Sequence, residues 1–320
     1  MQSTNETTTR TGKSMTEGGS FQRRHDLLIN DSESFRINHG DTIQHMAAEM
    51  GPDSVDAIVT SPPFFSVYSY TSLAEDLGNT ENPAEAKIHL SYMFKGLLRV
   101  LKPGRVMMMH CNQIQNMKRS GGEGVFDFRG FLIRIAIRSG WIFDYDWCVR
   151  RNPQSQAIRT RSRSLQFAGL ESDRSGSRGA LPDYLLKFRK PGPNAVPIQG
   201  EGQVSRNQWI EWAECCWTGI RETETLNTLE AKSEEDTRHI CAMQLDMIER
   251  LVRLYSNPGE IVFDPFMGIG STGYTALKLG RRAYGCEIKD EYHATAIKNC
   301  ERAIKLRDEK TTMPMFAGIE

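Results

Sequence analysis

The segment Thr60-Ser61-Pro62-Pro63-Phe64 carries residue types that could activate an aromatic amine. Two consecutive prolines fix their own φ angles and lack N–H donors, so carbonyl oxygens are presented rigidly at this point. The Ser61 hydroxyl and the Pro62 carbonyl could then accept both protons of one amino group and free its lone pair. Phe64 would supply a face on which an aromatic substrate stacks. We predict a catalytic site at Ser61, Pro62, Pro63 and Phe64, although a Pro-Pro pair can also simply end a strand.

A second segment, Asp264 to Thr272, places Gly268 and Gly270 between a predicted strand and a predicted helix. Glycines permit a sharp turn there and let a ligand approach the backbone closely. Glu287 ends the next predicted strand, where a carboxylate can accept hydrogen bonds from both ribose hydroxyls of a nucleoside cofactor. Gly273 would supply the third glycine of the dinucleotide fingerprint, so a nicotinamide-dependent oxidoreductase stays open at this point.

The elements that must position these segments follow from the hydrophobic pattern, in which short apolar runs alternate with helical periodicity. This alternation predicts an α/β fold with a mostly parallel sheet covered by helices on both faces. Strands are predicted at 35–38, 56–60, 105–111, 141–149, 184–188, 261–264 and 281–287. Helices are predicted at 42–49, 83–101, 128–139 and 243–255, from the glycine loop to 279, and from the last strand to about 307.

The amino-acid composition excludes few classes of function. The 320 residues carry 40 basic and 40 acidic side chains, so the net charge gives no sign of a nucleic-acid partner. No apolar run is long enough for a membrane span, and the N-terminus lacks a secretory signal. The seven cysteines are an odd number without C-x-x-C spacing, which predicts reduced thiols in a cytoplasmic protein and implies no metal site.

Taken together, the segments resemble the β class of amino-group DNA methyltransferases, in which the catalytic motif precedes the cofactor loop. The resemblance covers residues 35 to 307. It implies a Rossmann-like S-adenosylmethionine-dependent methyltransferase fold, circularly permuted, with an inserted DNA-recognition region. It also implies S-adenosyl-L-methionine as cofactor, bound by Asp41, His239, Asp264, Pro265, Phe266, Gly268, Gly270, Ser271, Thr272 and Glu287.

The order of the motifs separates this class from others. RNA and protein glutamine methyltransferases with related motifs generally place the cofactor loop before the catalytic motif, the reverse of the order here. Methylation at C5 of cytosine needs a cysteine nucleophile, usually after proline, and this sequence contains no Pro-Cys pair. Ser61 stands where adenine-specific relatives usually carry aspartate, which favours N4 of cytosine as the target. N6 of adenine is the alternative, and a catalytically silent DNA-binding relative is a third, against which the intact motifs argue.

Seven arginines between Arg150 and Arg178, opposed only by Glu171 and Asp173, create a local positive field. Such a field suits phosphate contacts and guanine recognition, and in the family this stretch lies in the variable region that contacts DNA. A solvated loop is the other interpretation. The predicted DNA-binding residues are Arg150, Arg151, Arg159, Arg161 and Arg163.

These interpretations divide the chain into five parts. A disordered tail covers 1–24, and the catalytic half of the core covers 25–149. A target-recognition region covers 150–235, with a core strand near 183–190 and a small tryptophan core. The cofactor-binding half covers 236–308, followed by a tail at 309–320. Double-stranded DNA is the expected partner, while a homodimer and a cognate restriction endonuclease stay open and no membrane is involved.

Overall fold

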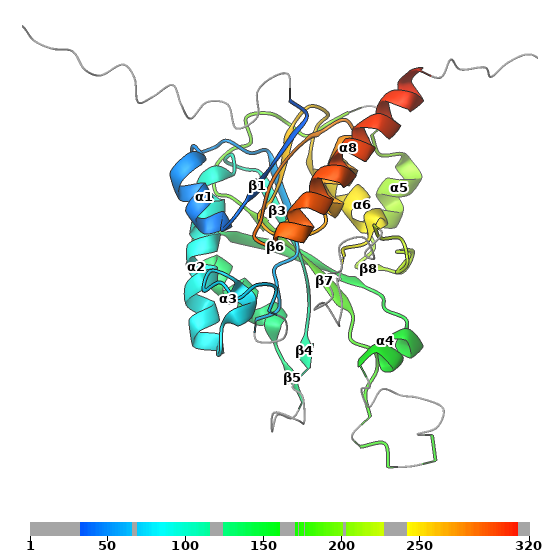
Figure 1. The fold of residues 1–320 in the computed structure, drawn as a ribbon. Helices are drawn as coiled ribbons and strands as arrows, with labels where there is room; N and C mark the ends of the chain where they lie inside the picture. Colours follow the sequence, from blue (N-terminus) through cyan, green and yellow to red (C-terminus); the bar gives the residue numbers. More distant parts are fainter. Residues whose placement is uncertain are drawn as a thin grey trace, which may run out of the picture.

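The computed structural model describes residues 33–65, 69–115, 124–160, 170–171, 173–175, 177–200, 203–226 and 242–312. One sheet of eight strands runs through the described part in the order β1-β10-β9-β2-β3-β7-β6-β8 (Figure 1). Its strands are β1 (Phe35–His39), β2 (Ala57–Thr60), β3 (Val106–Asn112), β6 (Ile142–Val149), β7 (Asp183–Arg189), β8 (Cys216–Trp217), β9 (Ile261–Asp264) and β10 (Arg282–Glu287). A separate antiparallel pair joins β4 (Ile114–Gln115) and β5 (Val125–Phe126).

The sheet is mostly parallel, as the alternation of strands and helices predicts. Only β7 among its strands runs against its neighbours, pairing antiparallel with both β3 and β6. The helices are α1 (Thr42–Glu49), α2 (Pro83–Val100), α3 (Phe128–Arg138), α4 (Pro153–Thr160), α5 (Arg206–Trp212), α6 (Leu245–Tyr255), α7 (Ser271–Lys278) and α8 (Asp290–Thr312), with a 3-10 turn η1 (Leu77–Asn79).

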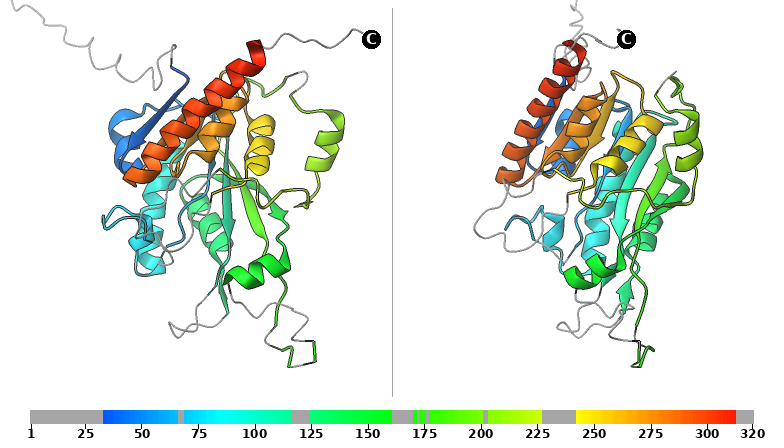
Figure 2. Two further views of the ribbon diagram at one scale, coloured as in Figure 1. Left: turned by 45° about the vertical axis from the view of Figure 1, so that its right-hand side comes forward. Right: turned by 90° about the vertical axis from the view of Figure 1, so that its right-hand side faces the viewer.

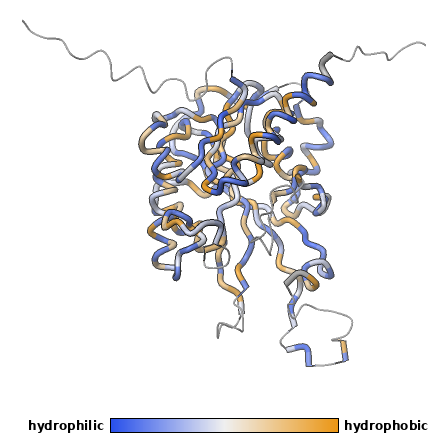
Figure 3. Tube along the Cα trace, in the orientation of Figure 1, coloured by the Kyte–Doolittle hydropathy of each residue, from blue (hydrophilic) through white to orange (hydrophobic). Residues whose placement is uncertain are grey.

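Helices cover both faces of the sheet because successive strand residues point to opposite sides. In β2, Ile58 packs with the residues of α1, α2 and α3, whereas Val59 packs with those of α6, α7 and α8. The same alternation separates Phe263 from Val262 in β9. Figure 2 shows the two helical layers on either side of the sheet, and Figure 3 shows the hydrophobic residues gathered along the central strands.

The sheet order brings together two segments that lie far apart in the sequence. β9 pairs with β2, so Asp264 lies beside Thr60 although 204 positions separate them. Both strands, together with β10, end at the same edge of the sheet because they are parallel. The predicted catalytic segment, residues 60–64, therefore meets the glycine loop, which comes later in the chain. This order of segments suggests a circular permutation, which stays a prediction.

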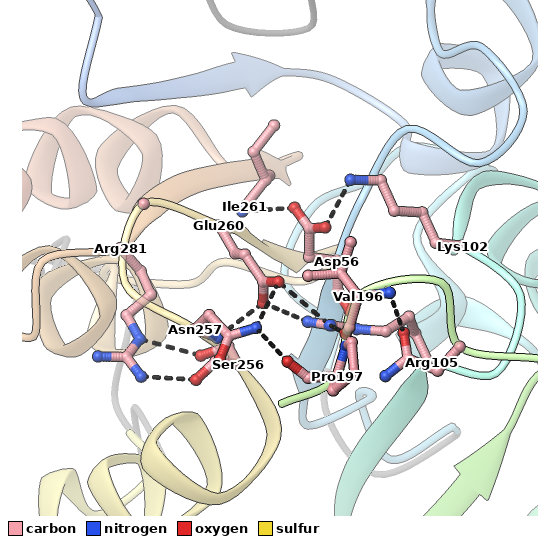
Figure 4. A network of polar contacts seen from close by, with 12 residues as sticks. Asp56, Lys102, Arg105, Val196, Pro197, Ser256, Asn257, Glu260, Ile261 and Arg281 are labelled. Carbon is pink, nitrogen blue, oxygen red and sulfur yellow. Dashed lines mark hydrogen bonds and ion pairs between the residues drawn. The ribbon is translucent and has the colours of Figure 1, made fainter. Parts of the chain in front are cut away.

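The opposite edge of the sheet is held by a buried network of charges (Figure 4). The Arg105 guanidinium donates 2.7 Å to the Asp56 carbonyl and forms an ion pair with Glu260. The Asp56 carboxylate in turn accepts hydrogen bonds from the Ile261 amide at 2.9 Å and from Lys102 Nζ at 2.5 Å. These contacts join the beginnings of β2, β3 and β9, so they fix how the two halves of the sheet meet.

Several features differ from the sequence prediction, which includes neither α5 nor the short strands β4, β5 and β8. Residues 153–160 form α4 where the pattern predicts no regular structure, because Asn152 Oδ1 accepts the amide hydrogens of Gln154 and Ser155 and caps the helix. The last helix continues to residue 312 instead of about 307. Trp209 is 64% exposed, whereas Trp212 and Trp217 are buried and form the predicted small core.

Some predictions concern residues outside the described part of the chain. The disordered tail predicted for 1–24 lies there, as does His239. Within the described residues, no helix is both long enough and apolar enough to cross a membrane.

Candidate active site

A cavity lies at the edge of the sheet where β2, β9 and β10 end. Residues from both halves of the sequence line it, and they include most of the predicted catalytic and cofactor residues. The predicted residues that line the cavity are Asp41, Ser61, Pro62, Pro63, Phe64, Asp264, Pro265, Phe266, Gly268, Ser271, Thr272 and Glu287. The structure therefore brings the predicted catalytic turn and the predicted cofactor loop to one cavity.

The turn after β2 is anchored on one side and open on the other. Pro62 and Phe65 are buried, and Phe65 packs in the core beneath the turn. The Phe64 ring lies 5.6 Å from the ring of Phe128 and is only partly buried. Ser61 is also partly buried, and both Ser61 and Phe64 line the cavity. This arrangement suits a flat, polar substrate.

Ser61 has a partner that the sequence does not reveal. Its Oγ lies 3.1 Å from Nδ1 of His110, a residue of β3. On the other side of the imidazole, Nε2 lies 3.1 Å from Oδ2 of Asp183, the first residue of β7. The same carboxylate oxygen lies 2.8 Å from Nε of Arg151, and Asn112 Nδ2 donates 2.6 Å to the other oxygen.

The Asp183 side chain is only 1% exposed. Burial disfavours its charge, but the neighbouring His110 and Arg151 outweigh that cost and hold the pKa of Asp183 below its ordinary value. A buried anion is therefore fixed behind the imidazole. No local signal predicts this chain of contacts, because 49 positions separate Ser61 from His110 and the contacts form only when β7 pairs with β3.

Glu287 ends β10 with its carboxylate against the cavity. One oxygen accepts the Gly268 amide hydrogen at 2.7 Å and the other accepts that of Lys289 at 2.9 Å. Burial raises the pKa of Glu287, and these backbone hydrogen bonds oppose that effect. A carboxylate has about four lone-pair positions, so this one can accept a further hydrogen bond. The geometry fits a ligand with two neighbouring hydroxyls.

Asp264 is used differently. Its Oδ1 accepts hydrogen bonds from Thr60 Oγ1 at 2.7 Å and from the Phe266 amide at 3.0 Å, while its Oδ2 accepts from Thr272 Oγ1 at 2.7 Å. Burial raises its pKa to about 7, against the hydrogen bonds from the two threonines. The side chain therefore joins β2, the glycine loop and α7, and it holds the cavity wall in shape.

The N-terminus of α7 lies at the cavity, which Ser271 and Thr272 line. Gly270 caps this helix with φ 90°, a conformation that favours glycine, and no side chain accepts the first amide hydrogens. Ser271 Oγ is buried and has no hydrogen-bond partner among the described residues. A buried hydroxyl without a partner at a lined cavity fits a polar ligand group. Gly270 does not itself line the cavity; it shapes the turn.

Asp41 lies at the other side of Glu287. Its carboxylate caps α1 by accepting the amide hydrogens of Ile43 and Gln44, and the neighbouring Gly40 amide donates 2.9 Å to the Glu287 carbonyl. This contact brings the start of α1 to the cavity.

The loop before α2 supplies a wall that sequence reasoning missed. The buried Asp76 carboxylate accepts the amide hydrogens of Tyr70 and Thr71 at 2.7 Å each and of Gly78 at 2.8 Å. These hydrogen bonds fold the loop so that Tyr70 lies against Tyr292 of α8, with ring centroids 6.2 Å apart. The loop has no periodic pattern, so nothing in the sequence indicated it. The further lining residues include Tyr70, Glu75, Asp76, Leu77, Ala242, Met243 and Tyr292.

Of the predicted DNA-binding arginines, Arg150 and Arg151 lie between β6 and α4, and Arg159 lies in α4. β6 ends at the same edge of the sheet as the cavity, because β7 is antiparallel to both β6 and β3 (Figure 1). Arg150 is exposed. Arg151 is 17% exposed and is bound by Asp183, with Glu222 at 3.6 Å. The Arg159 side chain, Arg161 and Arg163 lie outside the described part.

Comparisons with known proteins agree with this geometry. A family model named N6_N4_Mtase and described as "DNA methylase" matches residues 55–298. The chain is 49% identical to the Type II methyltransferase M.BglII of Bacillus subtilis over 80% of its length, and the match spans 66% of that relative. It is 39% identical to the DNA adenine methyltransferase YhdJ of Escherichia coli over 85% of this chain and 84% of the relative.

Two solved structures share the fold. The PvuII DNA methyltransferase (cytosine-N4-specific) superposes with a TM-score of 0.61 at 18% identity and covers 87% of this chain and 92% of its own. TTHA0409 from Thermus thermophilus, a DNA modification methylase complexed with S-adenosyl-L-methionine, gives a TM-score of 0.62 at 21% identity, with 84% and 94% covered.

Proposed function

Because the chain belongs to the N6_N4_Mtase family of DNA methylases, we propose that it transfers a methyl group from S-adenosyl-L-methionine to an exocyclic amino group of a DNA base. The observation that carries the proposal is the shared cavity: the Ser61-Pro62-Pro63-Phe64 turn and the Glu287 carboxylate line the same space. A base must leave the duplex to reach such a cavity, as it does in other enzymes that modify bases.

The residues of the cavity fit the cofactor. Glu287 would accept hydrogen bonds from the two ribose hydroxyls, and Ser271 with the start of α7 would bind a polar group of the methionine part. When bound, S-adenosyl-L-methionine supplies a methyl group on a positively charged sulfur. Asp264 and the glycine loop hold these groups in place.

On the substrate side, Ser61 Oγ and the Pro62 carbonyl would accept the two amino hydrogens, and Phe64 would stack against the base ring. Holding the hydrogens out of the ring plane localises the lone pair on nitrogen. The chain then needs only to position the amine for in-line attack, without a covalent intermediate on the protein.

For the target atom, N4 of cytosine is the favoured candidate, because Ser61 stands where adenine-specific relatives usually carry aspartate. N6 of adenine is the second candidate, favoured by the 39% identity to a relative named as a DNA adenine methyltransferase.

Double-stranded DNA is the proposed partner. The predicted contacts, Arg150, Arg151, Arg159, Arg161 and Arg163, belong to the segment that leaves the sheet at the edge of the cavity, where cations would meet the phosphates beside an extruded base. A homodimer, a cognate restriction endonuclease and a cytoplasmic location complete the proposal.

The test is to incubate the protein with mixed-sequence duplex DNA and S-adenosyl-L-methionine carrying a CD3 group, then to digest the DNA and measure nucleosides by mass spectrometry. We expect N4-methylcytosine with a mass increase of the CD3 label. Labelled N6-methyladenine alone would refute the cytosine assignment and support the second candidate. No labelled nucleoside, with duplex binding retained, would refute the enzymatic function and support a silent DNA-binding relative.

A further inference from the structure

Resting on the proposed function, we propose that His110 is the proton acceptor and positioning residue behind Ser61, backed by the buried Asp183. Neither residue belongs to the Ser61–Phe64 turn or to the glycine loop. The inference deepens the proposed function, because it states where the proton of the target amine goes.

The buried carboxylate favours one tautomer of the imidazole. Its Nε2 lies 3.1 Å from a carboxylate oxygen of Asp183, as an ion-pair contact that does not meet hydrogen-bond geometry. Because that oxygen is an acceptor only, we infer that Nε2 carries the hydrogen. Nδ1 is then an acceptor, and it lies 3.1 Å from Ser61 Oγ. The Ser61 hydroxyl must donate to Nδ1, which leaves its lone pairs directed to the cavity. Neutral His110 thus makes Ser61 an acceptor for an amino hydrogen.

The charges around His110 favour its role as a proton acceptor. Asp183 faces it from β7, and Arg151 faces that carboxylate from the chain after β6, with Glu222 next to Arg151. On the same strand, burial raises the pKa of the Cys111 thiol far above its ordinary value, so the thiol is neutral.

Two further charged groups near this edge neutralise each other. Arg129 of α3 and Asp146 of β6 form an ion pair at 2.6 Å. Asp183 is therefore the anion that lies closest to the imidazole among the charged groups described here, and it would stabilise an imidazolium.

The proton balance of the reaction follows from these contacts. As the new bond from nitrogen to the methyl carbon forms, the methyl–sulfur bond breaks and its electron pair stays on sulfur. One N–H bond of the amine then breaks, and its electron pair returns to nitrogen. That proton passes to Ser61 Oγ while the hydroxyl proton of Ser61 passes to Nδ1 of His110. The imidazolium beside Asp183 returns the proton to water when the product leaves.

The sharpest variant is His110→Asn, because an amide oxygen can take the place of Nδ1 as acceptor for Ser61 but cannot take up a proton. Single-turnover methylation would be measured from pH 5.5 to 9, with S-adenosyl-L-methionine affinity measured by calorimetry. In the wild type we expect the rate to fall towards low pH. In the variant we expect a rate about 100-fold lower at pH 8 that no longer falls towards low pH, with cofactor affinity within about twofold.

Two controls separate this role from a structural one. His293→Asn changes a histidine of α8 whose ring contacts the Ile37 carbonyl, and we expect a wild-type rate and pH profile. In a Ser61→Ala background, His110→Asn should add little further loss, because the two residues act in one chain. Additive losses, or a His110→Asn enzyme with the wild-type rate and profile, would overturn the inference.

A measurement without turnover makes the test independent of activity. In wild-type protein with 15N-labelled histidine, the His110 signal, identified by its absence from the variant, should show a hydrogen on Nε2 and none on Nδ1 at pH 8. A hydrogen on Nδ1 at that pH would overturn the inference even if the protein methylates DNA. If the wild type yields no methylated nucleoside, the proposed function fails as well.

Discussion

Replacing Asp264 by asparagine tests how the buried carboxyl of the cofactor loop affects stability. The side chain is 3% exposed, and burial raises its pKa to about 7 from an ordinary value of 3.8. A carboxyl with a raised pKa in the folded state holds a proton that the unfolded chain has already released. Its contribution to stability is therefore fully present below about pH 4 and is lost as the pH rises towards 7.

The magnitude follows from the size of the shift. Each unit of pH inside this window changes the free energy of unfolding by about 1.4 kcal/mol for one proton. Between pH 5 and pH 7 the wild type should lose about 2 kcal/mol from this group, with little further change above pH 7. For a chain of 320 residues that loss corresponds to about 3 °C in Tm.

Asparagine removes the titration but keeps the shape. Its amide oxygen can still accept from Thr60 and from the Phe266 amide. Its amide nitrogen would donate to Thr272 Oγ1, which can turn its own hydrogen to the Val59 carbonyl, 3.5 Å away. We therefore expect Asp264→Asn to lower stability most at pH 5, and the difference from the wild type to shrink or reverse by pH 7.

The assay is thermal unfolding of both proteins without cofactor, followed by circular dichroism, at pH 5, 6, 7 and 8. Asp308→Asn is the matched control, because it makes the same change at a side chain that is 61% exposed. A Tm difference between Asp264→Asn and the wild type that stays constant from pH 5 to pH 8 would refute the reasoning.

Three further outcomes are expected. Glu287→Gln should weaken S-adenosyl-L-methionine binding at least tenfold by calorimetry, because one acceptor oxygen becomes a donor; unchanged affinity would contradict the assignment. Glu260→Ala should lower the free energy of unfolding by about 3 kcal/mol in urea titrations, because it leaves the 1%-exposed Arg105 guanidinium unpaired. Gly270→Ala should lower the free energy of unfolding by at least about 2 kcal/mol, because its φ is 90° and a Cβ would lie 3.0 Å from the α8 backbone. The control Gly259→Ala has a φ of 79° but open space around the new Cβ, so it should lower the free energy of unfolding by only about 1 kcal/mol.

The sequence predicts the elements of the core well because their signals are local. Apolar runs such as 261–264, bounded by Asn257-Pro258-Gly259 and the glycine loop, mark a buried strand without reference to the rest of the chain. That the segment from Ser61 to Phe64 and the Glu287 carboxylate line one cavity was also predictable, since each lies where a predicted strand ends. Residues 153–160 were not, because the cap from Asn152 and the two hydrogen bonds that join Gln156 to Leu181 outweigh a polar, arginine-rich pattern.

The contacts behind the catalytic turn were beyond prediction for a different reason. His110 ends an apolar run and Asp183 begins another, and each alone is typical of a strand terminus. They meet only because β7 enters the sheet antiparallel to β3, a pairing that depends on where a long, irregular segment returns the chain. The local sequence pattern determines which residues form strands, whereas the pairing of one strand with another determines which polar residues at the strand ends come into contact.

The two acids of the cofactor side show how burial and hydrogen bonding divide their roles. Asp264 and Glu287 are both buried, and burial raises the pKa of each. The Asp264 carboxylate accepts three hydrogen bonds from within the protein, from Thr60, Phe266 and Thr272, so we expect its removal to lower the stability of the fold first. Glu287 is bound by backbone amides, including those of Gly268 and Lys289, and its carboxylate lines the cavity, so its removal should be felt first in binding. The two acids share one chemistry, but Asp264 is tied to side chains of two other elements whereas Glu287 lies against the cavity, and we expect them to differ in function for that reason.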